Sequence, residues 1–177
     1  MTPLPNIILP EKEKVFIKNG KVIPDPNLIK INQLMTKSNE SNENGDIKAA
    51  IKYCSQALAL DSTYAEAYFA RGTLKLNNFQ FDDAVADLDK ALQFEPYMDV
   101  ALANRAFARI RKYQFANSRT LSKNAEVTVL ASPDKISIPA DEQQKICNDL
   151  QEAIFLGDKT KMIMDALSDY CGANSSN

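Results

Sequence analysis

A pattern of small and apolar residues that recurs every 34 positions constrains the fold of this chain more than any other feature of its sequence. Leu34, Tyr68 and Leu102 have this spacing. A second set has the same spacing: Ala50, Cys54, Ala57 and Leu58 correspond, 34 positions later, to Ala84, Leu88, Ala91 and Leu92. A period of this length marks a supersecondary unit that cannot bury its apolar face alone and therefore stacks on copies of itself. The sequence predicts a helical solenoid.

The stretch from Ala65 to Pro96 shows what one repeat contains. Its apolar residues recur at three- and four-residue steps, which predicts two antiparallel helices joined by a short turn. Small residues occupy the places where the helices approach closely, namely Gly72, Ala84 and Ala91. This stretch resembles a tetratricopeptide repeat (TPR), in which small residues stand at the eighth, twentieth and twenty-seventh places. Tyr68 matches the usual aromatic at the fourth place, whereas Lys75 departs from the usual aromatic at the eleventh.

The resemblance implies an all-α TPR solenoid, a right-handed superhelix, over residues 27–171. We expect repeats at about residues 27–64, 65–98 and 99–157, and a capping helix at about 159–171. In the third repeat the register is lost after Phe115 and returns at a spacing of 62 from the second repeat. This shift indicates an insertion of 28 residues between the two helices, at about residues 114–141. Residues 172–177 are expected to form a mobile tail.

Two parts of the sequence favour β-structure. Residues 1–26 are interrupted by prolines and contain the pair Asn19-Gly20 between β-favouring runs, which predicts a β-hairpin. The insertion contains two further β-type runs, 127–130 and 136–138, around the turn Ser132-Pro133-Asp134. We therefore expect short accessory β-hairpins at the N-terminus and in the insertion. Their pairing into one small sheet is a further hypothesis.

The composition excludes several classes of function. The formal net charge of -2 gives no reason to expect a nucleic acid or an anionic membrane as partner. The 177 residues include no histidine, so the commonest general base and metal ligand is missing. The sequence has no Gly-rich phosphate loop and no cluster with metal-ligand spacing. We expect no enzymatic activity, no cofactor and no metal site.

The densest acidic stretch comprises Asp82, Asp83, Asp87 and Asp89. This spacing spreads the four carboxylates around a helix, so we interpret them as a solvated face and not as a paired-carboxylate site. An enzyme would need titratable groups that converge in one pocket. The acidic stretch therefore does not change the expectation of a non-catalytic protein.

The three cysteines are irregularly spaced, which indicates neither a disulfide framework nor a zinc site. Cys54 and Cys147 fall on apolar helix stripes and are interpreted as small buried hydrophobes. The start MTPLPNIILP has no basic region and too short an apolar stretch for a secretory signal, so we expect the cytoplasm. Export is the alternative, if a native leader is missing. No apolar run approaches the roughly 20 residues that span a bilayer, so we expect no membrane insertion.

The resemblance also implies a binding surface, because in stacked TPRs the first helix of each repeat lines a concave groove. The register assigns to this groove the residues Asn39, Phe69, Thr73, Leu76, Asn77, Asn104, Phe107 and Arg111. Phe69 and Phe107 are aromatic residues on the groove side. Two explanations stay open for them: burial against the terminal helix or the insertion, or service as anchors for a bound segment.

Some TPR domains bind a C-terminal carboxylate with a clamp of Lys, Asn and Arg. The corresponding positions here are Met35, Asn39, Ala70, Val100 and Asn104. Only Asn39 agrees, so we do not expect a clamp for chaperone tails. The leading hypothesis is a non-catalytic scaffold that binds a peptide or protein segment of unknown identity in the groove. The alternative is a structural, self-associating protein, such as a homodimer, whose groove is filled by its own insertion or by a second subunit.

Overall fold

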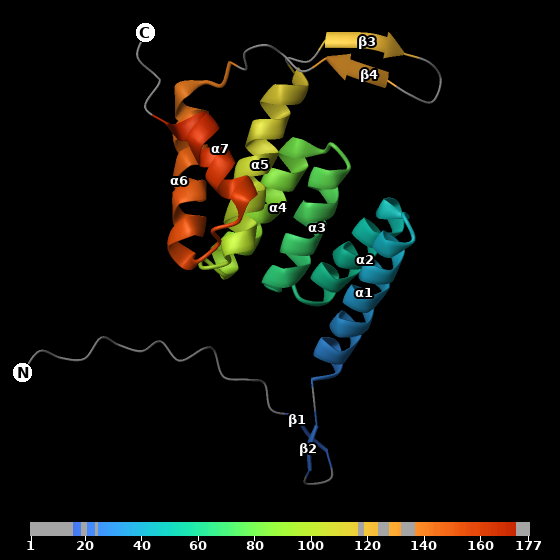
Figure 1. Cartoon of the computed structure of the whole chain (residues 1–177). Coiled ribbons are helices and arrows are strands. Elements are labelled where there is room, and N and C mark those ends of the chain that lie inside the picture. The colour runs from blue at the N-terminus through green and yellow to red at the C-terminus, as the bar shows by residue number, and fades with distance from the viewer. Residues whose placement is uncertain are drawn as a thin grey trace, which may run out of the picture.

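The computed structural model describes the backbone of residues 16–18, 21–23, 25–116, 119–123, 128–131 and 137–172, and the side chains of 25–116 and 137–172. Its helices are α1 (Pro26–Glu43), α2 (Ile47–Leu60), α3 (Ala65–Asn77), α4 (Phe81–Phe94), α5 (Asp99–Ala116), α6 (Ala140–Leu156) and α7 (Lys161–Cys171). Each helix packs on the next one along the chain, and α3 also contacts α5. The helices form one stacked array, with α1 and α2 at one end and α6 and α7 at the other (Figure 1).

Local sequence signals explain where the first helices begin and end. The Asp25 carboxylate accepts a hydrogen bond of 2.8 Å from the Asn27 amide, and Pro26 opens α1 with a backbone angle that suits a helix. Gly45 has a φ of 79°, a conformation that glycine adopts at no steric cost, and it separates α1 from α2. Asp46 then caps α2 through a 2.9 Å hydrogen bond from the Ala49 amide.

The buried residues follow the register predicted from the sequence. Nine side chains at equivalent positions of the three helical hairpins are fully buried: Ala50, Cys54 and Ala57, then Ala84, Leu88 and Ala91, then Ile146, Leu150 and Ala153. The first two sets are 34 residues apart and the last two are 62 apart. The pattern of buried residues thus resumes in α6 at these three positions.

Gly72 occupies the closest approach between α3 and α4. A Cβ atom at this position would lie 2.9 Å from Leu88 Cγ and 3.2 Å from the carbonyl oxygen of Ala84. The equivalent positions in the neighbouring repeats hold Ser38 and Ala106, which are also buried. Ser38 fits there because its hydroxyl donates a 3.0 Å hydrogen bond to a carbonyl of α2. The second hairpin is therefore the most tightly packed of the three at this place.

Replacement of Gly72 by alanine is expected to destabilise the protein, although alanine is the better helix former. The propensity gain is about 1 kcal/mol, whereas overpacking of a filled core costs about 1–3 kcal/mol. The steric cost wins because Leu88 is fully buried and the carbonyl of Ala84 belongs to the backbone of α4. Urea unfolding measures the difference, and a variant more stable than the wild type would contradict this account.

A buried aspartate between two cations recurs in the second and third hairpins. Arg71 donates to Asp87 from Nε (2.8 Å) and Nη2 (2.6 Å), and its Nη1 donates to Ser55 Oγ (3.0 Å). Lys75 Nζ lies 2.8 Å from the same carboxylate. The interpretation of Asp87 as part of a solvated face is therefore wrong, since this residue is 5% exposed. Lys75 departs from the usual TPR aromatic because it pairs with Asp87.

The third hairpin repeats this arrangement, with Asp89 in place of Ser55 and Arg109 in place of Lys75. Arg105 donates to Asp149 from Nε (3.0 Å) and Nη2 (2.6 Å), and its Nη1 donates to Asp89 of α4 (2.7 Å). Arg109, which is 34 positions after Lys75, pairs with the same Asp149 carboxylate. The hydrogen bonds accepted by Asp87 raise the pKa of the Arg71 guanidinium above its ordinary value. Each arginine thus links its own hairpin to the preceding one.

Two pairs of short antiparallel strands lie outside the helix packing: β1 (Phe16–Lys18) with β2 (Lys21–Ile23), and β3 (Arg119–Lys123) with β4 (Thr128–Ala131). Within the described ranges, no strand makes a substantial contact with a helix. The packed fold is therefore all-helical. The prediction that accessory β-hairpins form part of this fold is corrected, because the described strands, of three to five residues each, make no substantial contact with a helix.

The strand pairing in the insertion also differs from the sequence-based expectation. The sequence predicts that residues 127–130 pair with 136–138, but β4 pairs with β3, which precedes it. The two strand pairs are separate two-stranded sheets, so the hypothesis of one small sheet is wrong for the described strands. The predicted turn at residues 132–134 and the expected mobile tail at 173–177 lie outside the described residues.

Part of the insertion lengthens helices. The repeat register would end α5 near Arg111, which is the equivalent of Asn77 at the end of α3, but α5 continues to Ala116. In the same way, α6 begins at Ala140, three residues before the position that corresponds to Phe81 at the start of α4. The two helices of the third hairpin are therefore longer than those of the second. The added residues lie at the end of α5 and the start of α6, on the side of the array where the insertion emerges (Figure 1).

Candidate binding cleft between α5 and α7

A cleft of about 540 Å³ lies between α5 and α7. The α5 wall presents Phe107, Ile110 and Arg111, and the α7 wall presents Met162 and Ala166, with other residues of both helices around them. These side chains combine apolar surface with the exposed cation of Arg111. Lys161 and Asp165 also line the cleft and pair with each other at 2.7 Å.

Two of the groove residues predicted from the sequence line this cleft. Phe107 is half-buried, packs on the core and lines the cleft. Arg111 is exposed, and among the described side chains it makes no hydrogen bond or ion pair. Its guanidinium therefore stays available to an acceptor from outside the chain. These two residues supply the apolar and the charged part of the candidate site.

The other predicted groove residues lie away from the cleft. Asn104 Nδ2 donates a 3.0 Å hydrogen bond to Thr73 Oγ1, which ties α5 to α3. Phe69 is half-buried against the largest core cluster. The remaining exposed positions are Asn39 and Asn77. The structure thus gives Phe69 a packing role and joins Thr73 to Asn104, whereas only Phe107 and Arg111 meet in one cleft.

Leu76 needs a correction. The repeat register assigns it to the groove, but it is 5% exposed and packs with Phe81, Ala84 and Ala108 in a core cluster. The reason is that α3 and α5 are in contact, so the leucine that the register places on the groove side is covered by α5. A ligand in the groove cannot gain appreciable contact with this side chain.

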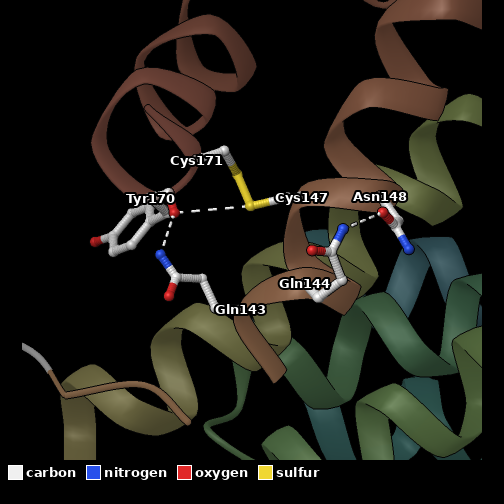
Figure 2. Close-up of a disulfide and its surroundings, with 6 residues drawn as sticks. All are labelled: Gln143, Gln144, Cys147, Asn148, Tyr170 and Cys171. Carbon is white, nitrogen blue, oxygen red and sulfur yellow. Dashed lines mark hydrogen bonds between the residues drawn. A yellow bond between two sulfur atoms is a disulfide. The ribbon is translucent and has the colours of Figure 1, made fainter. Parts of the chain in front are cut away.

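The α7 wall is fixed by a disulfide between Cys147 of α6 and Cys171 at the end of α7. Figure 2 shows the surrounding contacts: Gln143 Nε2 donates a 2.7 Å hydrogen bond to the Tyr170 carbonyl, and the Cys147 sulfur lies 3.7 Å from that carbonyl oxygen. Gln114 of α5 donates a 2.9 Å hydrogen bond to the Tyr170 hydroxyl. The interpretation of Cys147 as an unpaired buried hydrophobe is therefore wrong.

Cys54, in contrast, agrees with its sequence-based interpretation. It is a free cysteine of α2, fully buried in a core cluster with Ala50 and with Leu74 of α3. Burial raises the pKa of its thiol, and its sulfur lies 3.1 Å from the Ser38 hydroxyl. A buried thiol with a raised pKa forms little thiolate and is chemically inert.

Metal ligation and membrane insertion find no support in the described part of the chain. No group of three or more His, Cys, Asp or Glu residues is arranged there to hold a metal ion. None of its helices combines the length and the apolar character required to cross a bilayer. The insertion as an occupant of the groove stays a prediction, because the side chains of residues 117–136 lie outside the described residues.

Comparisons with known proteins agree with this architecture. A model of the tetratricopeptide repeat family matches residues 65–97. The chain is 34% identical over 73 residues to the mouse (Mus musculus) protein DnaJ homolog subfamily C member 7, a match that covers 40% of this chain and only 15% of that relative. The chain therefore corresponds to a small part of this curated relative.

Solved structures give the same assignment for the whole helical array. The TPR domain of Arabidopsis OM64 superposes with a TM-score of 0.62 at 17% identity, over 81% of this chain and 96% of that one. The first TPR domain of Spaghetti (RPAP3), bound to the HSP90 peptide SRMEEVD, gives a TM-score of 0.63 at 15% identity, over 84% and 95%. The chain thus carries a tetratricopeptide repeat and has the fold of TPR domains.

Proposed function

We propose that this protein is a non-catalytic interaction scaffold that binds a peptide or protein segment in the cleft between α5 and α7. The observation that carries the proposal is the cleft itself, lined by the half-buried ring of Phe107 and by the exposed guanidinium of Arg111, which is unpaired among the described side chains. Solenoids of this kind present extended concave surfaces to their partners. The solved domain of Spaghetti, which has the same fold, is bound to an HSP90 peptide.

The chemistry of the cleft defines the segment that it would accept. An apolar side chain of the ligand would replace water against Phe107 and the exposed Met162, and a carboxylate or carbonyl would accept hydrogen bonds from Arg111. The carboxylate clamp of other TPR domains is not reproduced, since Met35, Ala70 and Val100 stand at three of its positions. Recognition would therefore rest on the C-terminal end of the array and not on a clamp spread over three repeats.

The location of the protein is part of the same proposal. Disulfides persist in oxidising compartments and are rare in the reducing cytosol. The bond between Cys147 and Cys171 therefore favours the exported alternative over the cytoplasm that the sequence alone suggests. An oxidising compartment keeps the α7 wall of the cleft attached to α6.

The test of this function is a capture experiment with the double variant Phe107→Ala and Arg111→Ala. Partners that wild-type protein recovers from a lysate are expected to be lost, because truncation of two central contacts weakens binding by at least about tenfold. Lys112→Ala is the matched control, since it removes a neighbouring charge that pairs with Asp82 outside the cleft. Circular dichroism verifies that each variant is folded. Equal recovery by wild type and a folded double variant would overturn the proposal.

A further inference from the structure

We propose that the disulfide between Cys147 and Cys171 is a redox switch that controls the cleft. With the bond closed, α7 stands as one wall of the cleft; reduction by a dithiol frees the C-terminal turns of α7 and removes that wall. Only one part of this inference rests on the proposed function, namely that reduction of the disulfide weakens binding in the cleft. Its structural part, the release of α7, concerns the chain alone and is tested separately.

The first observation is that α7 has few other attachments. Among the described helices, α7 packs substantially on α6 alone. It contributes two buried side chains, Ile163 and Ala166, and both lie in its first six residues. Leu167 and Tyr170 in its second half are only partly buried against the core. The end of α7 therefore depends on the disulfide more than on burial.

The second observation is that the polar contacts of this end converge on the residue next to the disulfide. The backbone carbonyl of Tyr170 accepts a 2.7 Å hydrogen bond from Gln143. The side-chain hydroxyl of Tyr170 accepts a 2.9 Å hydrogen bond from Gln114. Two hydrogen bonds between neutral groups contribute about 1 kcal/mol each. They position Tyr170 accurately while the covalent link holds α7 in place (Figure 2), but they cannot replace that link.

The third observation is that the same turns of α7 form the cleft. Asp169 and Tyr170, which directly precede Cys171, line the cleft together with Ala166 and Met162. Gln114, which bonds to Tyr170, lines it from α5. When these turns leave α6, Asp169 and Tyr170 leave the lining of the cleft with them. The state of the disulfide and the shape of the binding cleft are therefore coupled through adjacent residues.

The chemistry of the switch balances with an external dithiol as reductant. A thiolate of the dithiol attacks one cysteine sulfur, the S–S bond breaks, and the other cysteine departs as a thiolate that takes up a proton. The second thiolate of the reductant then displaces the first cysteine, which is also protonated, and the reductant ends as a cyclic disulfide. Cys147 and Cys171 are both partly exposed and open to this attack. Cys54 is fully buried and does not compete.

Hydrogen–deuterium exchange of the full chain, before and after treatment with dithiothreitol, tests the release of α7. Amides in the last two turns of α7 are expected to exchange on the order of 100-fold faster after reduction, while those of α3 and α4 keep their rates. Alkylation under denaturing conditions verifies the state, with one labelled thiol in the oxidised chain and three in the reduced chain. Unchanged α7 exchange in a chain with three labelled thiols would overturn the proposal.

The double variant Cys147→Ser and Cys171→Ser serves as the matched control. Without reductant it is expected to show the fast α7 exchange of the reduced wild type, and dithiothreitol is expected to change nothing further. Binding of the dye anilinonaphthalene sulfonate adds a second readout, because release of the last turns of α7 uncovers the apolar core surface on which Leu167 and Tyr170 pack. Its fluorescence is expected to rise several-fold on reduction of the wild type only. A reductant effect of equal size in the double variant would assign the change to another cause and overturn the switch.

The capture experiment separates the two proposals. Partners whose recovery requires Phe107 and Arg111 are expected to be recovered by the oxidised chain and lost from the reduced chain. If α7 exchange responds to reduction while recovery ignores Phe107 and Arg111, the proposed binding function fails and the release of α7 stands. If recovery requires both residues but is equal in the oxidised and reduced chains, the switch is overturned and the binding function stands.

Discussion

Replacement of Asp149 by alanine is expected to lower the free energy of unfolding by about 3 kcal/mol, because it leaves two largely buried guanidinium groups without their shared acceptor. Asp149 is 4% exposed and accepts hydrogen bonds from Arg105 and Arg109. Arg105 retains Asp89 as a partner, but Asp89 is half-exposed and already accepts from it. The helix propensity gained with alanine, about 0.6 kcal/mol, is too small to offset the loss.

Urea unfolding followed by circular dichroism measures this difference, and Asp165→Ala provides the control. Asp165 also pairs with a cation, Lys161, at 2.7 Å, but both side chains are mainly exposed. An exposed ion pair one turn apart on a helix contributes about 0.3–0.5 kcal/mol. The comparison therefore isolates burial as the cause. Equal losses in the two variants would show that the Asp149 network contributes no more than a surface pair.

Replacement of Leu88 by alanine is expected to cost about 3 kcal/mol, within the range of large-to-small substitutions in packed cores. Leu88 is fully buried, and its Cγ fills the space directly above Gly72. Gly72 has no side chain that could move into the cavity, and the adjoining backbone of α4 is held by the pair between Arg71 and Asp87. The site therefore cannot collapse, and most of the cavity is expected to remain.

The matched control for Leu88 is Leu28→Ala, the same chemical change at a residue near the start of α1 that is 44% exposed. Its cost is expected to stay below about 1 kcal/mol, since only part of its surface leaves water on folding. Thermal unfolding of both variants gives the comparison. A Leu88→Ala variant as stable as Leu28→Ala would mean that α3 closes onto α4, against the tight contact at Gly72.

The ion pairs and the candidate cleft are mechanically connected. Arg105 and Arg109 fix α5 between α4 and α6 through Asp89 and Asp149. Phe107, which lines the cleft, lies between these two arginines on the same helix. Arg105 and Arg109 thus point toward one side of α5, and Phe107 points toward another. The ion pairs on one side of the helix therefore hold in place the residue that lines the cleft on the other.

The sequence by itself determined the helical array and most of its core. The 34-residue period identifies the second hairpin and, with the shift to 62, is sufficient to place Ile146, Leu150 and Ala153 of α6 in the core. Such patterns are reliable because each hairpin must bury apolar residues, which recur at fixed spacings along its helices, against the neighbouring hairpins. The sequence also determined Phe107 and Arg111 as neighbours on α5, one turn apart.

The disulfide lies within reach of sequence reasoning, although the spacing of the cysteines along the chain does not indicate it. Cys147 stands nine residues before the end of α6, and Cys171 stands ten residues after the start of α7. In an antiparallel helical hairpin, residues equally far from the connecting segment face each other, so a connection at residues 157–160 places the two cysteines opposite one another. The three cysteines are irregularly spaced along the chain, but Cys147 and Cys171 lie at similar distances from the turn between α6 and α7.

Other features were decided only by the tertiary structure. The burial of Asp87 depends on Arg71 and Lys75 reaching it from another helix, and nothing in the local pattern of four aspartates distinguishes it from its solvated neighbours. Leu76 is excluded from the groove because α5 covers it. In each case the local helix period predicts on which face of its helix the side chain lies. Its solvent exposure depends on which residues of a neighbouring helix pack against that face. That partner is set by the packing of helices distant in sequence, and a local period does not contain this information.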